Sequence, residues 1–554
     1  SGIIALTLSP MMCSKVLRHS DDKRGLPALI DAIFDRSQRI YLRMLNASLR
    51  DRLATVVFTF IALGSLIFLF LDTAKELAPD EDQGAAFLAY QGPSNANIDY
   101  MDRFSGNMKS LFGQIKEVDG FFTINGLQGV NSGFGVAVLK PWNERKRGQK
   151  EIVPEMAAKV GEVPGLMGSV FPIPALPGND GMPIQFQITT TADYKSLNEV
   201  VQRFKAKAAK SGMFIYSDVD LKYEKPQTIV EIDRDKAAAY GVRMESIAQT
   251  LALLTGGNYV NLMNLYNRSY EVIPQVARID RLAPDLLGRQ FYVKTVDGKS
   301  IPLSSIVTLR EEIQPVNLNQ FNQQNSAQLQ GVPMPGVSVG TVLDFLEKTA
   351  KEVLPEGFSY DYAGQSRQYI QEGYALYATL GFAIAIIYLV LAAQFESFRD
   401  PLVIMISVPL SMCGAMIPLA LGVTTMNIYS QVGLITLVGL ITKHGILICE
   451  VAKEQQRDYG LSRLEAVSIA AGLRLRPILM TTAAMVAGLI PLMFASGAGA
   501  ASRFSIAVVI IAGMSIGTLF TLFVLPVLYS FIASDHRKQQ AVTGTRGRDL
   551  TVER

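Results

Sequence analysis

Lys443 is the residue whose position most strongly suggests chemistry. It follows a run of 42 uncharged residues, 401–442, and the apolar sequence continues beyond it to Cys449 before Glu450 is reached. A charged side chain at bilayer depth costs at least ~2.5–3.5 kcal/mol, so it needs a partner or a function. A lysine near a helix end can also reach the membrane surface, but the next charged residue lies two helical turns further on. We therefore interpret Lys443 as part of an ion pathway.

Further polar residues stand at helical spacing around Lys443. Thr436 and Glu450 lie seven residues before and after it, which places all three on one face of a helix. Arg474 and Thr481 are also seven residues apart, at the start of the next predicted helix. Lys443, Arg474 and Thr481 thus form a candidate proton relay. The alternative is that Arg474 anchors the cytoplasmic side and that Thr481 bonds its own helix.

The predicted relay lacks a counter-charge. No Asp or Glu stands in the middle of any apolar segment, whereas an ammonium group at that depth requires an anionic partner. We therefore expect the partner carboxylates on a segment that this chain does not contain.

The elements that position these residues are predicted membrane spans, each of about 20 residues. Residues 53–71, 373–395, 477–502 and 504–534 give one span each, and residues 401–449 give two with a polar break at 422–427. Basic residues precede the first span, separate the fourth from the fifth and follow the last. The positive-inside rule places these three segments in the cytoplasm and residues 73–371 on the other side.

Composition agrees with a membrane protein. The 554 residues are 49% hydrophobic. The net charge of +3 is small, and the basic residues flank the predicted spans rather than forming a nucleic-acid-binding face. The three cysteines all fall in apolar stretches, so we expect neither a disulfide framework nor a metal site. No nucleophile–base set or phosphate-binding loop is recognisable, which argues against an enzyme, and we expect no cofactor.

The outer loop and the N-terminal region complete the predicted fold. Residues 73–371 alternate short strand patterns with helical ones, which predicts ferredoxin-like β-α-β subdomains. Residues 27–46 form a basic amphipathic helix on the inner membrane surface. Residues 1–13 are apolar without a basic leader, so they resemble the last half of a membrane helix. The expected fold is a membrane α-helical bundle of six full spans plus a partial N-terminal one, with a large periplasmic α/β insertion.

Several segments resemble signatures of one family. Residues 431–448 resemble a transmembrane signature of resistance–nodulation–division (RND) efflux pumps of the hydrophobe/amphiphile (AcrB-like) branch. Residues 473–482, 497–500 and 392–397 do so as well, and residues 77–84 resemble the start of the family's porter domain. The resemblance covers residues 1–533. It implies a trimeric proton/drug antiporter of the bacterial inner (cytoplasmic) membrane that works with a periplasmic adaptor and an outer-membrane channel.

The resemblance also assigns roles to residues. The family's essential lysine, its arginine and its relay threonine fall on Lys443, Arg474 and Thr481. The aspartates that they engage belong to a first-half helix, so the chain resembles the C-terminal half of the family protein. His444 departs from the asparagine of many relatives, and we interpret it as a neutral core group rather than one that tunes the relay.

A substrate pocket is implied in the outer loop. Residues 122–129 are similar to the family's switch loop and residues 171–175 to its second pocket strand. The residues expected to line the pocket are Phe122, Ile124, Leu127, Val136, Phe171 and Ile173. Leu127 and Gly129 stand where aromatic residues are expected, which argues against strong binding of planar aromatic drugs. The alternative is that these side chains are ordinary porter core. Residues 256–261 and those that follow resemble a hairpin that reaches toward a neighbouring subunit or the outer channel.

The resemblance divides the chain into nine segments. They are the end of a truncated membrane helix (1–18), a cytoplasmic amphipathic helix (19–52), a membrane helix (53–72), a porter subdomain (73–179), a second porter subdomain in two parts (180–223 and 319–371), a channel-docking subdomain (224–318), five membrane helices (372–534) and a disordered cytoplasmic tail (535–554).

The sequence thus predicts a proton/drug antiporter subunit that exports amphiphilic drugs through a tripartite complex. Its expected partners are the missing N-terminal half with the aspartate pair, further copies in a homotrimer, the adaptor, the channel and the lipid bilayer, but no nucleic acid. One alternative is a heavy-metal efflux pump of the same fold, although Met156, Met167, Met182 and Met213 are scattered. The other is a truncated fragment that does not transport.

Overall fold

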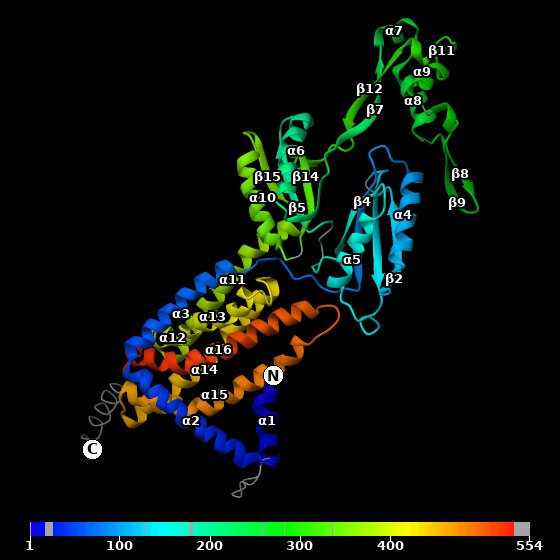
Figure 1. Cartoon of the computed structure of the whole chain (residues 1–554). Helices are drawn as coiled ribbons and strands as arrows, with labels where there is room; N and C mark the ends of the chain where they lie inside the picture. Colours follow the sequence, from blue (N-terminus) through cyan, green and yellow to red (C-terminus); the bar gives the residue numbers. More distant parts are fainter. Residues whose placement is uncertain are drawn as a thin grey trace, which may run out of the picture.

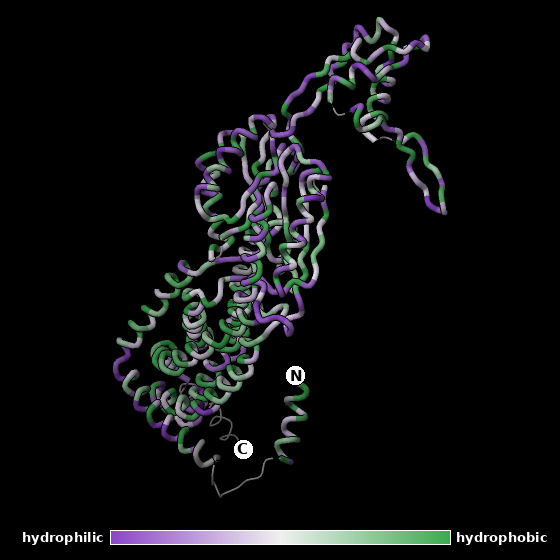
Figure 2. Tube along the Cα trace, turned by 45° about the vertical axis from the view of Figure 1, so that its right-hand side comes forward, coloured by the Kyte–Doolittle hydropathy of each residue, from purple (hydrophilic) through white to green (hydrophobic). Residues whose placement is uncertain are grey.

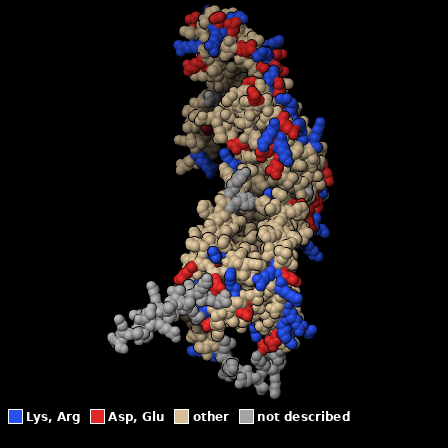
Figure 3. All heavy atoms as spheres, turned by 90° about the vertical axis from the view of Figure 1, so that its left-hand side faces the viewer, with Lys and Arg blue, Asp and Glu red and all other residues tan. Residues whose placement is uncertain are grey.

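The structure is a computed structural model, and it describes residues 2–16, 26–127, 129–176, 181–257, 259–281, 283–334 and 336–536. Most of the predicted tail and part of the first two predicted segments lie outside the described residues. The molecule is elongated, with a helical bundle at one end, two α/β units beside it and a smaller unit at the far end (Figure 1). Charged side chains gather over the α/β units and at the opposite end of the bundle, and a largely uncharged surface lies between them (Figure 3).

The described residues contain six helices that are long and apolar enough to cross a membrane, as predicted. They are α3 (Arg52–Asp72), α11 (Gly364–Phe395), α12 (Arg399–Met405) together with α13 (Ser407–Ala420), α14 (Ile428–Tyr459), α15 (Arg463–Met493) and α16 (Ala500–Ile532). The α12–α13 span breaks at Ile406. Pro409 has no N–H to bond the carbonyl of Met405, which accounts for the break.

Local signals fix the ends of these helices. A capping box of Asn427 and Ser430 begins α14, and another of Ser462 and Glu465 begins α15. Gly460, at φ 65°, ends α14 in the left-handed conformation that glycine adopts without strain. The predicted boundary between the last two spans, at Arg503, is wrong. The turn lies between Met493 and Ala500, and Arg503 is inside α16.

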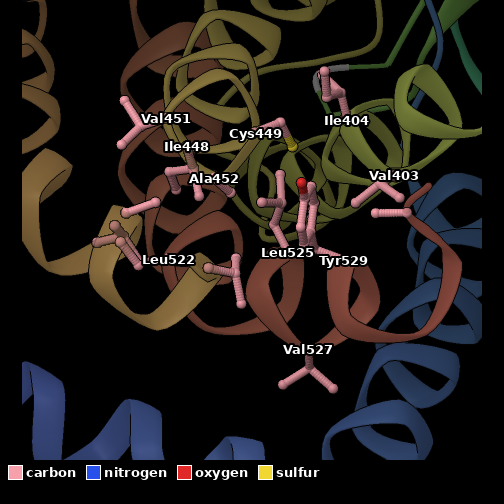
Figure 4. Close-up of a cluster of buried hydrophobic side chains, with 14 of the residues drawn as sticks. Val403, Ile404, Ile448, Cys449, Val451, Ala452, Leu522, Leu525, Val527 and Tyr529 are labelled. Carbon is pink, nitrogen blue, oxygen red and sulfur yellow. The ribbon is translucent and has the colours of Figure 1, made fainter. Parts of the chain in front are cut away.

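α16 lies at the centre of the bundle. Its apolar residues form one buried cluster with α12 and α14, part of which is shown in Figure 4. The cluster includes Val403 and Ile404 of α12, Ile448 and Ala452 of α14, and Leu522, Leu525 and Tyr529 of α16. A second cluster joins α13, α14 and α16 around Met416, Leu437 and Met514.

The two N-terminal helices differ in how they contact the bundle. α2 (Leu26–Arg50) covers the amphipathic segment predicted as a helix, and it packs on α15 and α16. Its Tyr41 hydroxyl donates to the Leu522 carbonyl at 2.8 Å, and the Gln38 amide donates to the Gly472 carbonyl at 3.0 Å. α1 (Gly2–Val16) stands apart from the bundle (Figures 1 and 2).

The first α/β unit is contiguous in sequence. It consists of β1 (Ala85–Gln91), α4 (Ile98–Phe112), β2 (Val118–Asn125), β3 (Ser132–Leu139), α5 (Gln149–Gly161) and β4 (Met167–Pro172). The strands form one antiparallel sheet in the order β2-β3-β1-β4. One sheet face packs on α4 and α5 through buried residues such as Leu88, Met101 and Ile152.

The second α/β unit has the same order of elements, with an insertion. It consists of β5 (Ile184–Thr190), α6 (Tyr194–Lys210), β6 (Phe214–Val219), the short β13 (Gln320–Phe321), β14 (Gln324–Pro333), α10 (Val339–Val353) and β15 (Phe358–Tyr362). β14 pairs with β5 and β6, and β5 pairs with β15, all antiparallel. Phe186, Phe204 and Leu343 are among its buried residues. β6 ends at Val219, and a separate strand begins at Tyr223.

A two-stranded arm, β7 (Tyr223–Ile232) and β12 (Val307–Pro315), connects the inserted unit to the second unit. It contains α7 (Arg234–Ala239), α8 (Met244–Thr255), the hairpin β8 (Asn261–Leu265) and β9 (Arg268–Val272), η1 (Arg278–Arg281), α9 (Pro284–Gln290), β10 (Tyr292–Lys294), β11 (Ser300–Pro302) and η2 (Leu303–Ser305). Ile247, Phe291 and Leu303 form part of its own core, and the hairpin extends away from it (Figure 1).

Candidate functional site

Lys443 lies on a face of α14 that the other described residues leave exposed. Thr436, Lys443 and Glu450 are all exposed along this face, whereas Thr442 and His444 beside the lysine are buried. Lys443 is 15 residues into α14, which places it about 22 Å from the first residue of the helix. Among the described residues, none makes a hydrogen bond or ion pair with its ammonium group. The seven-residue spacing therefore does place three polar side chains on one exposed face.

Arg474 and Thr481 lie on the neighbouring helix α15. Arg474 stands well inside this helix rather than at its start, because α15 begins at Arg463. The Nε atom of Arg474 is buried and has no hydrogen-bond partner among the described residues. The Thr481 hydroxyl donates to the Ile478 carbonyl of its own helix at 3.0 Å. The described structure contains no hydrogen bond that joins Lys443, Arg474 and Thr481 directly.

His444 points to the opposite side, into the core. Its ring nitrogens lie 3.5 Å from the Thr482 hydroxyl of α15 and 3.4 Å from the Thr518 hydroxyl of α16. These two hydroxyls are 3.3 Å apart. Each also donates to a carbonyl of its own helix, at 2.9 Å for Thr482 and 2.6 Å for Thr518. The sequence did not identify either threonine as a partner, because both come from other helices.

Two cationic groups of α14 and α15 have no partner among the described residues. They are the exposed ammonium of Lys443 and the buried Nε–H of Arg474, both on helices that are long and apolar enough to cross a membrane. A cation on such a helix is stabilised when an anionic group is supplied close by. Each of the two groups can therefore pair with a carboxylate.

The predicted pocket residues lie largely on one face of the first sheet. Strand register places Phe122 opposite Val136, Val136 opposite Phe87, and Phe87 opposite Phe171, in one row across four strands. In the next row Ile124 is opposite Phe134. Because side chains alternate along a strand, this row faces away from the core that contains Leu88 and Ala86.

The exposure of the predicted residues differs across this face. Phe122, Ile124 and Leu127 are exposed, and Val136 and Ile173 are half-buried. Phe171 is buried, where it packs with Met182 and Val332 at the boundary with the second unit. Leu127 lies in the turn after β2 rather than in the sheet.

Two aromatic residues of this face were missed by the sequence reasoning. The ring centroid of Phe87 lies 5.2 Å from that of Phe134 and 6.1 Å from that of Phe171. Side-chain alternation along the strand β1 places Phe87 on this side, but it does not identify the neighbours of Phe87 across the sheet. The face thus carries phenylalanines on all four strands, although Leu127 and Gly129 are not aromatic. For brevity we call Phe87, Phe122, Phe134, Val136 and Phe171 the aromatic face.

A profile of the AcrB/AcrD/AcrF family matches residues 1–533. The chain belongs to this family. An uncharacterized transporter of Haemophilus influenzae is 45% identical over 97% of the chain and 53% of its own length. The multidrug/solvent efflux pump membrane transporter MepB of Pseudomonas putida is 30% identical over 96% of the chain and 52% of its own length. The multidrug export protein AcrF of Escherichia coli is 27% identical over 96% of the chain and 53% of its own length. The chain therefore spans about half the length of these relatives of the RND class.

Proposed function

We propose that this chain is part of a proton-driven RND antiporter of the inner membrane that exports amphiphilic drugs. The observation that carries the proposal is the exposed, unpaired Lys443 on an apolar helix. The unpaired Arg474 Nε on the adjacent helix and the efflux activity named for relatives of the family support it.

In this mechanism Lys443, Arg474 and Thr481 engage carboxylates of an N-terminal half. Protonation of those carboxylates weakens their attraction to Lys443 and lets the helices shift. Each charge that crosses the membrane releases ~2.3 kcal/mol per 100 mV, and each pH unit adds ~1.4 kcal/mol. These energies are sufficient to drive helix movements.

The outer units would bind and release the substrate. We propose that the two α/β units are ferredoxin-like porter subdomains in the periplasm, since each follows the order β-α-β-β-α-β. The pocket would be formed by Phe122, Ile124, Leu127, Val136, Phe171 and Ile173, with Phe87 and Phe134 added. The inserted unit would dock to the outer-membrane channel through a tripartite complex with the adaptor, and three copies would assemble.

The heavy-metal alternative would be favoured by methionines that lie together. Met156 is buried in the first unit, Met213 packs against the second, Met182 contacts Phe171, and Met167 is 72% exposed. These positions do not favour a soft-metal path. The alternative of a fragment that does not transport is addressed by expressing the chain with and without a partner half.

The test is drug accumulation in pump-deficient cells that express this chain with a matching N-terminal half. We expect export only with both halves, and we expect Lys443→Ala to abolish it while the protein stays folded. Thr436→Ala is the matched control, because Thr436 lies on the same exposed face and its hydroxyl bonds its own helix at Val432. Undiminished proton-coupled export by Lys443→Ala would refute the relay. Export by the single chain would refute the need for partner carboxylates.

A further inference from the structure

The segment 73–83, between α3 and β1, is attached to the start of α14. The Met426 amide donates to the Ala74 carbonyl at 2.9 Å, and the Glu76 amide donates to the Met426 carbonyl at 3.1 Å. The Ile428 amide, in the first turn of α14, donates to the Leu77 carbonyl at 3.1 Å. This part of the segment therefore follows the end of the helix that carries Lys443.

The same segment is attached to the start of α16 through Glu81. The Glu81 side chain is 5% exposed and accepts hydrogen bonds from the amides of Ala501 at 3.1 Å and Ser502 at 2.7 Å, and from the Ser502 hydroxyl. Amides in the first turn of a helix have no acceptor within the helix, and the positive end of the helix dipole favours an anion. The carboxylate thus fixes the segment to α16.

The next residue is attached to the first α/β unit instead. The Asp82 carboxylate accepts from both terminal nitrogens of Arg145, from the Gln149 amide at 3.0 Å and from the Gly84 amide at 3.2 Å. Arg145 belongs to the loop before α5, and its side chain is 2% exposed. One peptide bond therefore separates Glu81, which contacts α16, from Asp82, which contacts the first α/β unit.

The segment continues directly into the aromatic face. β1 begins at Ala85, is one of the two inner strands of the sheet and carries Phe87. The segment also borders a cavity of about 390 Å³, whose lining includes Ala78, Asp80, Glu81, Asp82 and residues of the second unit. A second cavity, of about 420 Å³, is lined by Glu76 and Pro79 of the segment and by Ala501 of α16. The segment is therefore held by the contacts described above and has free space beside it.

We propose that residues 73–83 are a coupling segment, in which Glu81 transmits movements of the bundle through Asp82 to β1 and the aromatic face. The Glu81–α16 contact stays closed throughout the transport cycle, so that the start of α16 and the start of β1 move together. This inference rests on the proposed function. The rival explanation is that Glu81 only stabilises the first turn of α16.

The first experiment needs no transport. Hydrogen exchange is measured on the purified single chain with Glu81→Ala and with the control Asp80→Asn, which removes a neighbouring charge that has no hydrogen bond among the described residues. We expect Glu81→Ala to speed exchange at least fivefold both in residues 500–504 and in β1. Asp80→Asn should leave both unchanged. Faster exchange confined to residues 500–504 would overturn the proposal.

The second experiment uses the transporting two-half protein. Coupling free energies in proteins correspond to about 5- to 150-fold effects, so we expect Glu81→Ala to slow export at least fivefold. The double variant Glu81→Cys/Ser502→Cys, made with Cys13→Ser, should export slowly until a short cross-linker with two maleimide groups adds to the two cysteine thiols, and then recover. If Glu81 only stabilised the first turn of α16, a covalent link to the helix would not be expected to restore export.

Two results of the second experiment would overturn the proposal: unchanged export by Glu81→Ala, or export that the cross-link blocks. If the two-half protein itself exports nothing, the proposed function fails, and the exchange experiment still decides whether Glu81 restrains β1.

Discussion

Asp82→Asn should loosen the first α/β unit, because it removes the charge that Arg145 requires. Oδ1 of Asp82 accepts from Arg145, from the Gly84 amide at 3.2 Å and from Trp142 Nε1 at 3.2 Å. Oδ2 accepts from Arg145 at 2.8 Å and from the Gln149 amide at 3.0 Å. An asparagine has one acceptor oxygen, so in either orientation its NH₂ group faces donors.

The magnitude follows from burial. Removing one partner of a buried ion pair costs about 3–5 kcal/mol, because the other charge is left uncompensated. The Arg145 side chain is 2% exposed but that of Asp82 is 24% exposed, so we expect the lower end, about 3 kcal/mol. The control is Glu352→Gln, since the Lys207–Glu352 pair is 50% and 66% exposed and contributes about 0–1 kcal/mol.

The assay is hydrogen exchange of β1 and β3 in the full chain, because unfolding of several units together is not two-state. A loss of about 3 kcal/mol corresponds to roughly 100-fold faster exchange. Burial alone would raise the pKa of Asp82, but the hydrogen bonds from Arg145 and Gln149 and the Arg145 charge hold it below 3.8. A carboxyl whose pKa is lowered by folding stabilises the fold at pH values above its ordinary pKa of 3.8. The protection of wild-type β1 and β3 amides against hydrogen exchange should therefore fall as the pH drops below 3.8. Equal exchange in Asp82→Asn and Glu352→Gln, within threefold, would refute this reasoning.

Three further predictions concern the α/β units. Phe186→Ala should lower the free energy of unfolding of the second unit by about 3–5 kcal/mol, because the ring is fully buried and its centroid lies 5.4 Å from that of Phe204. Unchanged hydrogen exchange of the β5 amides would contradict this. Hydrogen bonds from Arg147 lower the pKa of Glu117 from 4.5 to about 2. The protection of wild-type β2 amides against hydrogen exchange should therefore decline as the pH falls from 4.5 to about 2, whereas Glu117→Gln should show no such decline. Phe87→Ala should weaken binding of amphiphilic dyes to the first unit in a fluorescence titration, and equal affinity would exclude Phe87 from the pocket.

The membrane helices could be predicted because apolar length is a local property of the sequence. The boundary between the last two spans was placed at Arg503 because Arg503 is the charged residue that divides the apolar sequence. The turn is instead made by Gly497 and Gly499, whose φ values are 86° and 75°. The three polar residues on the exposed face of α14 followed from their spacing alone. No local pattern could bring His444 to Thr518, since their contact depends on how two helices pack.

The aromatic face shows the same limit for strands. Phe122 and Phe171 were expected in the pocket by resemblance, whereas Phe87 lies between their strands through pairings that join β1 to β3 and β4. The register of such pairings is set by the hydrophobic pattern of the whole sheet rather than by a short segment. Side-chain alternation predicts the face on which a residue lies, but not its neighbours across the sheet.

The insertion of a whole unit into the second α/β unit determines the order in which the chain can fold. The first unit is complete once Pro172 is made, but β5 must wait for β14 and β15. At ~5–20 residues per second, about 140 residues of synthesis delay this pairing by roughly 7–28 s. The chain leaves and returns at one point, where the Val316 amide donates to the Lys222 carbonyl at 3.2 Å. A tight turn could therefore join these two residues directly, so the inserted unit can change in size without any change in the sheet below it.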